Sequence, residues 1–77
     1  MSEPELLDAR GLHCPMPVIE LQRAARRLEP GTVVRLLSDD PAASADVAAW
    51  CRMQRHELVS ADQSDEGVSS FVVRLRG

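Results

Sequence analysis

The sequence predicts an α/β (α+β) two-layer sandwich, in which two helices pack on one face of a four-stranded mixed sheet. Strand-like and helix-like segments follow one another in the order β-α-β-α-β-β. With 77 residues, the chain is expected to form one domain, 1–77. A chain of this size buries roughly 60% of its unfolded surface, so we expect a small core and no enclosed cofactor site.

Local signals set the expected bounds. Pro30 cannot continue a helix and therefore ends the first one. Asp39, Asp40 and Pro41 are typical of a helix start, with an N-cap followed by proline at the first helical position. The first two strands should be parallel through a right-handed crossover, and the last two should form a hairpin. The expected strands are 6–9, 32–38, 56–61 and 68–76, and the expected helices are 15–28 and 41–54.

Composition argues against several classes of function. The net charge is −3 and aromatic residues make up 3% of the chain, which disfavours direct nucleic-acid binding. The segment 1–5 is acidic and polar, unlike a signal peptide, and no apolar run is long enough to span a membrane. We therefore expect a cytoplasmic protein that does not interact with membranes and whose two cysteines stay reduced.

The first predicted helix has an unusual outer face. A helical wheel places Val18, Leu21, Ala25 and Leu28 toward the core. The opposite side mixes apolar and basic residues, which are enriched in protein interfaces, so it is a candidate docking surface for a partner protein; the alternative is that its arginines are simply solvated. This candidate docking surface comprises Met16, Ile19, Arg23, Arg26 and Arg27.

The most informative stretch is GLHCPMPV, residues 11–18. It predicts Cys14 at the N-cap, with Pro15 at the first helical position and Pro17 in the first turn, where missing amide donors cost little. The Met16 N–H should then be free near the sulfur. A helix N-terminus favours a negative charge by about 0.3–1 kcal/mol and would lower the cysteine pKa.

Three neighbours of Cys14 are expected to support it. Gly11 permits unusual backbone angles in the turn that presents the thiol. Arg10 and His13 would stabilise the thiolate further if they face the sulfur. The carboxylates Asp8, Asp39 and Asp40 should lie at the same edge, with Asp40 interpreted as turn and cap chemistry.

Other cysteine chemistries fit less well. Pro17 stands where a Cys-X-X-Cys motif has its second thiol, and no hydrolase triad is recognisable. The metal-ligand pool is only His13, Cys14, Cys51 and His56, so no metal is expected. Cys51 is predicted to point inward beside Trp50 as an inert residue; the alternative is a redox sensor in which it pairs with Cys14.

A lone exposed thiol on a small protein can hold sulfur as a persulfide and pass it on, because the terminal sulfur is itself the cargo. The sequence therefore predicts a sulfur carrier, a sulfurtransferase by class, with Cys14 as its only covalent residue. The alternative from another class is a non-catalytic regulatory module that binds proteins.

Residues 8–17, DARGLHCPMP, resemble the D-x-x-G-L-x-C-P-x-P pattern of the TusA (SirA-like) sulfur-carrier family, and the similarity extends over nearly the whole chain. The resemblance implies the sandwich fold and Cys14 as the sulfur-carrying residue. It also implies a cysteine desulfurase or rhodanese-like donor and a TusD- or DsrE-type acceptor. The implied pathway is tRNA 2-thiouridine synthesis or sulfur oxidation, while some relatives serve molybdenum-cofactor or selenium metabolism. Met16 departs from the glutamate that TusA proteins often have between the two prolines.

Overall fold

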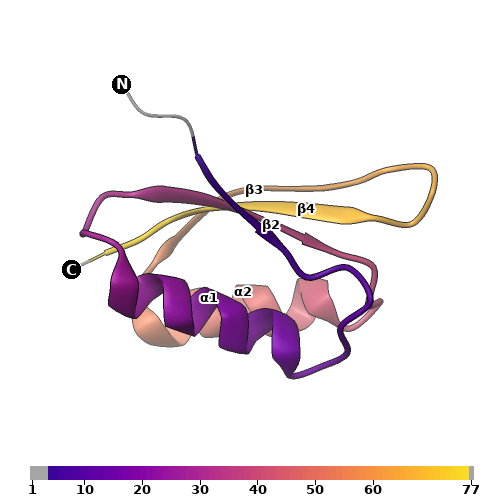
Figure 1. The fold of residues 1–77 in the computed structure, drawn as a ribbon, viewed down its shortest axis with the longest axis horizontal. Helices are drawn as coiled ribbons and strands as arrows, with labels where there is room; N and C mark the ends of the chain where they lie inside the picture. The colour runs from indigo at the N-terminus through magenta and orange to yellow at the C-terminus, as the bar shows by residue number, and fades with distance from the viewer. Residues whose placement is uncertain (1–3, 77) are drawn as a thin grey trace.

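The structure, a computed structural model, describes residues 4–76 and has the predicted β-α-β-α-β-β order. Both helices cover the same face of the sheet (Figure 1), so the predicted two-layer architecture is confirmed. The strands are β1 Glu5–Asp8, β2 Val33–Ser38, β3 Glu57–Gln63 and β4 Ser69–Arg74, and the helices are α1 Met16–Arg27 and α2 Ala43–Gln54.

The sheet is mixed, with strand order β1-β2-β4-β3. Strands β1 and β2 are parallel, as a crossover through α1 requires, whereas β4 runs antiparallel to both β2 and β3. The β3–β4 pairing shifts register between Leu58 and Ser60, so Val59 is an extra residue, as in a β-bulge. Sequence-based bounds differ from these by one or two residues at most strand ends.

The core lies between the sheet and the helices. Alternate residues of the two central strands point toward the helices and are completely or almost completely buried, as a half-covered sheet requires. Burying a large apolar side chain in this way stabilises the fold by about 1.5–3 kcal/mol. The largest fully buried apolar side chains are Leu21, Val34, Leu36, Val47, Phe71 and Val73.

Helix α1 is rotated slightly from the predicted wheel. Pro17, Leu21 and Ala24 are its buried residues, whereas Val18 and Ala25, both expected to face the core, are half-buried and pack against it. The rotation follows from where the helix begins, because a proline at the second helical position is packed inward. On α2, Ala43, Val47, Trp50 and Cys51 are buried, as the sequence predicts, and Gln54 is exposed instead of joining them.

Candidate functional site: the Cys14 loop

Cys14 is exposed and lies in the loop that joins β1 to α1. The helix begins at Met16 with Pro15 as its N-cap residue, and the Cys14–Pro15 peptide is cis. The prediction that Cys14 itself is the N-cap is therefore wrong by one residue. The thiol stands just outside the helix, so it is further from the helix end than the sequence suggested.

Two carboxylates on the β2–α2 connection hold this loop. The Cys14 N–H donates to Asp40 Oδ2 at 2.6 Å, and the Gly11 N–H donates to Asp39 Oδ1 at 3.0 Å. Gly11 has φ +83°, a backbone conformation that other residues rarely adopt, which confirms the predicted need for glycine in this turn. The loop is thus fixed by segments that lie 26 and 28 residues further along the chain.

Asp40 performs two tasks at once. Its Oδ1 accepts the Ala42 N–H at 3.0 Å, which is the predicted turn chemistry before α2, while its Oδ2 accepts the Cys14 N–H. These two backbone hydrogen bonds lower the pKa of Asp40, and the nearby His13 acts in the same direction. Asp40 is therefore ionised at neutral pH, close to the sulfur.

The Met16 N–H is not free near the sulfur, contrary to prediction. It donates to the His13 carbonyl at 2.8 Å and closes the turn that precedes the helix. The first turn of α1 therefore does not direct this amide at the thiol.

The thiol has a partner that the sequence did not reveal. Cys14 Sγ donates to Asp46 Oδ2, with 2.7 Å between the two atoms. This hydrogen bond raises the pKa of Cys14, as do partial desolvation and the charges of Asp46 and Asp40. The predicted lowering of the pKa is therefore wrong, because the Asp46 carboxylate on α2 outweighs the effect of the nearby end of α1.

Arg10 does not face the sulfur. It binds Asp8 through two side-chain hydrogen bonds, of 2.9 Å from Nε and 2.7 Å from Nη2, and its backbone N–H also donates to Asp8. These contacts lower the pKa of Asp8 to about 2. The pair stiffens the beginning of the loop, and the charge of Arg10 is balanced there. His13 is exposed beside Cys14, as predicted, and its side chain makes no hydrogen bond to the sulfur within the described residues.

An acidic cavity of about 710 Å³ lies beside the Cys14 loop, between the beginning of α2 and the β3–β4 hairpin. No basic residue is among those that line it. With Asp46 on the neighbouring turn of α2, this end of the molecule presents mostly negative charge. Its acidic lining residues are Asp39, Asp40, Asp62 and Glu66.

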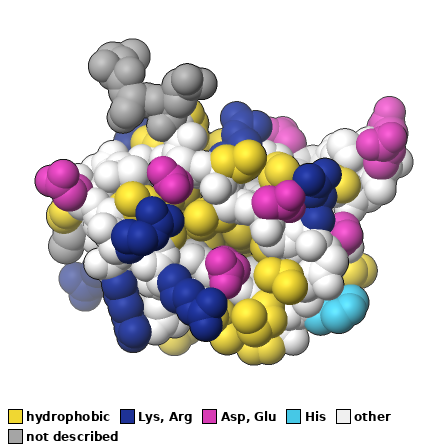
Figure 2. Space-filling model, viewed as in Figure 1, with side chains coloured by type: hydrophobic (Ala, Val, Ile, Leu, Met, Phe, Trp, Pro, Cys, Tyr) yellow, Lys and Arg dark blue, Asp and Glu magenta, His cyan; other side chains and the backbone are white. Residues whose placement is uncertain are grey.

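The candidate docking surface on α1 lies next to the loop. Met16 and Ile19 are half-buried, and the three arginines are exposed. Arg23 pairs with Glu20 at 3.1 Å and Arg27 with Glu5 at 3.5 Å. Figure 2 shows basic side chains over the later part of α1 and apolar surface nearer its beginning. The mixed character predicted for this surface is therefore present.

The second cysteine is remote from this chemistry. Cys51 is buried and reduced, and burial raises its pKa. Cys51 lies on the later part of α2, whereas Cys14 contacts Asp46 on its first turn. Within residues 4–76, no group of three or more His, Cys, Asp or Glu residues is arranged to hold a metal ion.

The fold and this site define a class of protein: a small α/β sandwich that presents a single thiol on a rigid loop ahead of a helix. The family model described as sulfurtransferase TusA matches residues 5–75, and the chain belongs to this family. Family membership gives it a sulfur-carrier role.

A solved structure agrees with this assignment. The chain is similar to a SirA-like protein from Desulfitobacterium hafniense, with 26% sequence identity and a TM-score of 0.82. The match covers 94% of this chain and 97% of that one, so the whole sandwich is shared. In the described part of the chain, neither helix has the length and apolar character needed to cross a membrane.

Proposed function

We propose that the protein carries sulfur as a persulfide on Cys14 and passes it from a donor protein to an acceptor cysteine. The observation that supports this most is that Cys14 is the exposed cysteine of the chain, while Cys51 is buried. Asp39 and Asp40 hold the backbone of the Cys14 loop, and Asp46 bonds the thiol itself. An exposed thiol that needs no second thiol suits a carrier.

The transfer conserves atoms and electrons. The Cys14 sulfur attacks the terminal sulfur of a persulfide on the donor; a new S–S bond forms, and the old one breaks. The donor cysteine leaves as a thiolate and takes up a proton, and Cys14 loses its own. Delivery to the acceptor cysteine repeats these steps in the opposite sense, so no external oxidant or reductant is required.

Asp46 would tune this cycle. Its carboxylate accepts a hydrogen bond from the thiol and raises the pKa of Cys14, so the unloaded carrier is mostly a thiol at neutral pH and reacts slowly with small oxidants. A donor that brings a positive group toward Asp46 would weaken this effect and release the thiolate only inside the complex.

The donor would be a cysteine desulfurase or a rhodanese-like protein, and the acceptor a TusD- or DsrE-type cysteine. Both would dock over the mixed surface of α1, which adjoins the loop. The relay would serve tRNA 2-thiouridine synthesis or sulfur oxidation.

The test of the carrier residue is mass spectrometry after incubation with a desulfurase and cysteine. The wild-type protein should gain one sulfur atom, Cys14→Ser none, and Cys51→Ser one. Loading that is lost only in Cys51→Ser would contradict the assignment. If Cys14→Ala still complements a deletion strain, the protein acts as a binding module instead.

The docking surface is tested by charge reversal at Arg26, which has no ion pair within the described residues. Arg26→Glu should slow sulfur transfer from the desulfurase without changing the alkylation of Cys14 by iodoacetamide. Arg35→Glu, on the sheet face away from the helices, is the matched control. Equal slowing by both variants would argue against a surface specific to α1.

A further inference from the structure

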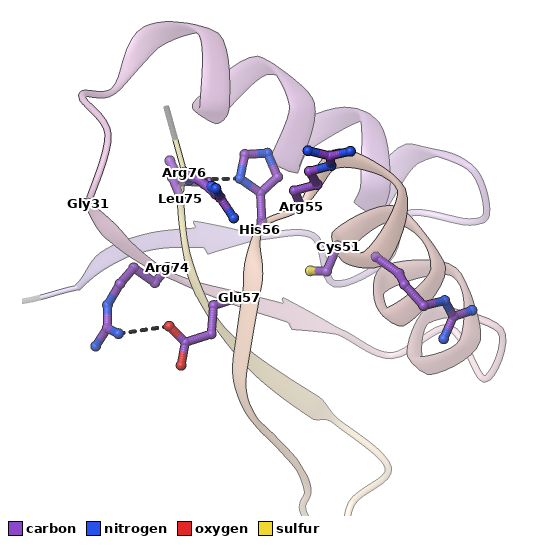
Figure 3. A pocket seen from close by; sticks show the side chains of 9 residues that line it. Gly31, Cys51, Arg55, His56, Glu57, Arg74, Leu75 and Arg76 are labelled. Carbon is purple, nitrogen blue, oxygen red and sulfur yellow. Dashed lines mark hydrogen bonds and ion pairs between the residues drawn. The ribbon is translucent and has the colours of Figure 1, made fainter.

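A second cavity, of about 570 Å³, lies at the other end of α2 from the Cys14 loop. It is formed where α2 ends and β3 begins, against the last residues of β4 and the turn before β2 (Figure 3). Its volume is in the range of small-molecule binding pockets, roughly 300–1,000 Å³. The sulfur-carrier role does not use it.

The cavity is strongly basic in a protein whose net charge is −3. Of the nine basic residues of the chain, all of them arginines, four line it: Arg52, Arg55, Arg74 and Arg76. The only acidic lining residue is Glu57, and Arg74 Nη1 binds it at 2.8 Å. Within residues 4–76, the other three arginines have no carboxylate partner.

A structural role explains part of this cluster. Basic side chains at a helix C-terminus complement the helix dipole, and Arg52 lies in the last turn of α2. The dipole does not account for Arg76, which follows β4, or for the concave space that these side chains surround. The residues that follow β4 thus add positive charge that the helix dipole does not explain.

Arg55 occupies a backbone position at the end of α2 that favours glycine. It follows the end of α2 with φ 63° and ψ 31°, the left-handed conformation in which helices usually place glycine. Its N–H closes the helix by bonding the Cys51 carbonyl, a contact that glycine would make equally well. An arginine here costs stability, and its guanidinium lines the cavity, which indicates a role for the side chain.

His56 forms a rigid polar wall beside these arginines. Its ring stacks on Trp50, with 4.6 Å between the ring centroids, and its Nδ1 accepts the Arg76 N–H at 2.9 Å. Burial lowers the pKa of His56, which favours the neutral ring. Because Nδ1 is an acceptor, the neutral ring bears its proton on Nε2 and has one donor left for a ligand. The side chains of Arg55, His56 and Arg76 lie close together in Figure 3.

We propose that this cavity binds a small phosphorylated molecule, whose phosphate oxygens are held by Arg55, Arg76 and His56. Guanidinium groups match phosphate geometry with paired hydrogen bonds, and three arginines without partners suit a ligand with two or more negative charges. The buried side chains of Cys51 and Leu75 supply an apolar wall for the organic part of the ligand. The volume exceeds what a phosphate ion alone would fill.

The chain has a built-in reporter for this binding, since Trp50 is its only tryptophan and stacks on His56. Ribose 5-phosphate and sodium pyrophosphate, titrated at constant ionic strength, should each change Trp50 fluorescence saturably. Amide NMR shifts should move at residues 52–57 and 74–76. Arg55→Gln and Arg76→Gln should each weaken binding about tenfold, the usual loss for one charged hydrogen-bond partner.

Arg35→Gln, on the sheet face away from the helices, removes the same charge from an exposed site elsewhere and should leave the affinity unchanged. Equal weakening by this control, or no saturation at millimolar ligand, would overturn the proposal. So would tighter binding of a hexaglutamate peptide than of either phosphate compound, since that result would indicate an acidic protein segment as the occupant. Sulfur loading of Cys14 should be the same in all three variants, which keeps this test independent of the carrier function.

Discussion

The two ends of α2 have opposite chemistry. At its beginning, Asp46 bonds the Cys14 thiol and Asp40 bonds the Cys14 amide. At its end, Arg52 and Arg55 line a basic cavity. A helix of 12 residues separates these ends by about 18 Å, at 1.5 Å per residue.

The helix dipole favours this arrangement at both ends, with acidic groups at the beginning and basic groups at the end. The neighbouring segments strengthen it. The β2–α2 connection and the β3–β4 hairpin add carboxylates to the first end, and the end of β4 adds arginines to the second. The modest net charge of the chain therefore conceals two strongly charged regions, and the acidic one includes the aspartates that bond Cys14.

The largest effect, a loss of stability, is expected from removing the Trp50 side chain that packs beneath the basic end of α2. Trp50→Ala deletes a side chain that is 8% exposed and on which His56 stacks. It should lower the free energy of unfolding by about 3–5 kcal/mol, measured by urea denaturation followed by circular dichroism. Met53→Ala, on the same helix but 77% exposed, should change it by less than about 0.5 kcal/mol. Similar losses in both would mean that Trp50 does not anchor this end.

The variant Asp46→Asn tests how the acidic end of α2 controls the Cys14 thiol. This variant replaces the carboxylate whose hydrogen bond, and to a smaller extent whose charge, raises the pKa of Cys14, so the thiolate fraction should increase. Alkylation by iodoacetamide near neutral pH should become several-fold faster, and its pH profile should shift to lower pH. Asp62→Asn, in the same acidic region, is the matched control and should have little effect. An unchanged profile in Asp46→Asn would show that the Cys14–Asp46 hydrogen bond is not formed in solution.

The basic end is expected to gain stability when its strained arginine is replaced. Arg55→Gly suits the left-handed conformation and should raise the free energy of unfolding by up to about 1 kcal/mol, or several degrees in Tm. The same variant should lose affinity for pyrophosphate. A fall in Tm on this substitution would show that the arginine makes stabilising contacts of its own.

The smallest effect concerns Asp8, at the start of the Cys14 loop. Its pKa is lowered to about 2 by its hydrogen bonds with Arg10, so its stabilising contribution is fully present above its ordinary value of 3.8 and is lost as the pH falls through 2. NMR titration of the side-chain carboxyl carbon should show this value in the wild-type protein and a return toward 3.8 in Arg10→Gln. A wild-type pKa near 3.8 would contradict the pairing.

The sequence predicted the fold well because its signals are local. Pro30 and Gly31 mark the end of one helix, and the β-branched and apolar residues of 32–38 indicate a strand. The position of Cys14 in an exposed turn before a helix follows from the glycine and prolines that flank it. The family pattern in residues 8–17 points to the same loop as the functional site.

The electrostatics of the site were not predictable in this way. Asp46 is 32 residues from Cys14, and only the packing of α2 against the loop brings them together. Arg10 looked available to the sulfur, but Asp8, two residues earlier, binds it. The helix begins one residue later than predicted, and the Met16 amide therefore donates to the His13 carbonyl and is not free beside the sulfur. A sequence pattern thus does not predict interactions that depend on tertiary contacts or on single hydrogen bonds.

The aspartates that bond the amides of Gly11 and Cys14 have a consequence for affinity. A loop already ordered in the unbound protein loses little conformational entropy when another molecule closes over it. Under the proposed carrier function, the donor and the acceptor would therefore meet the same preformed shape, and neither would have to reorganise it before sulfur transfer.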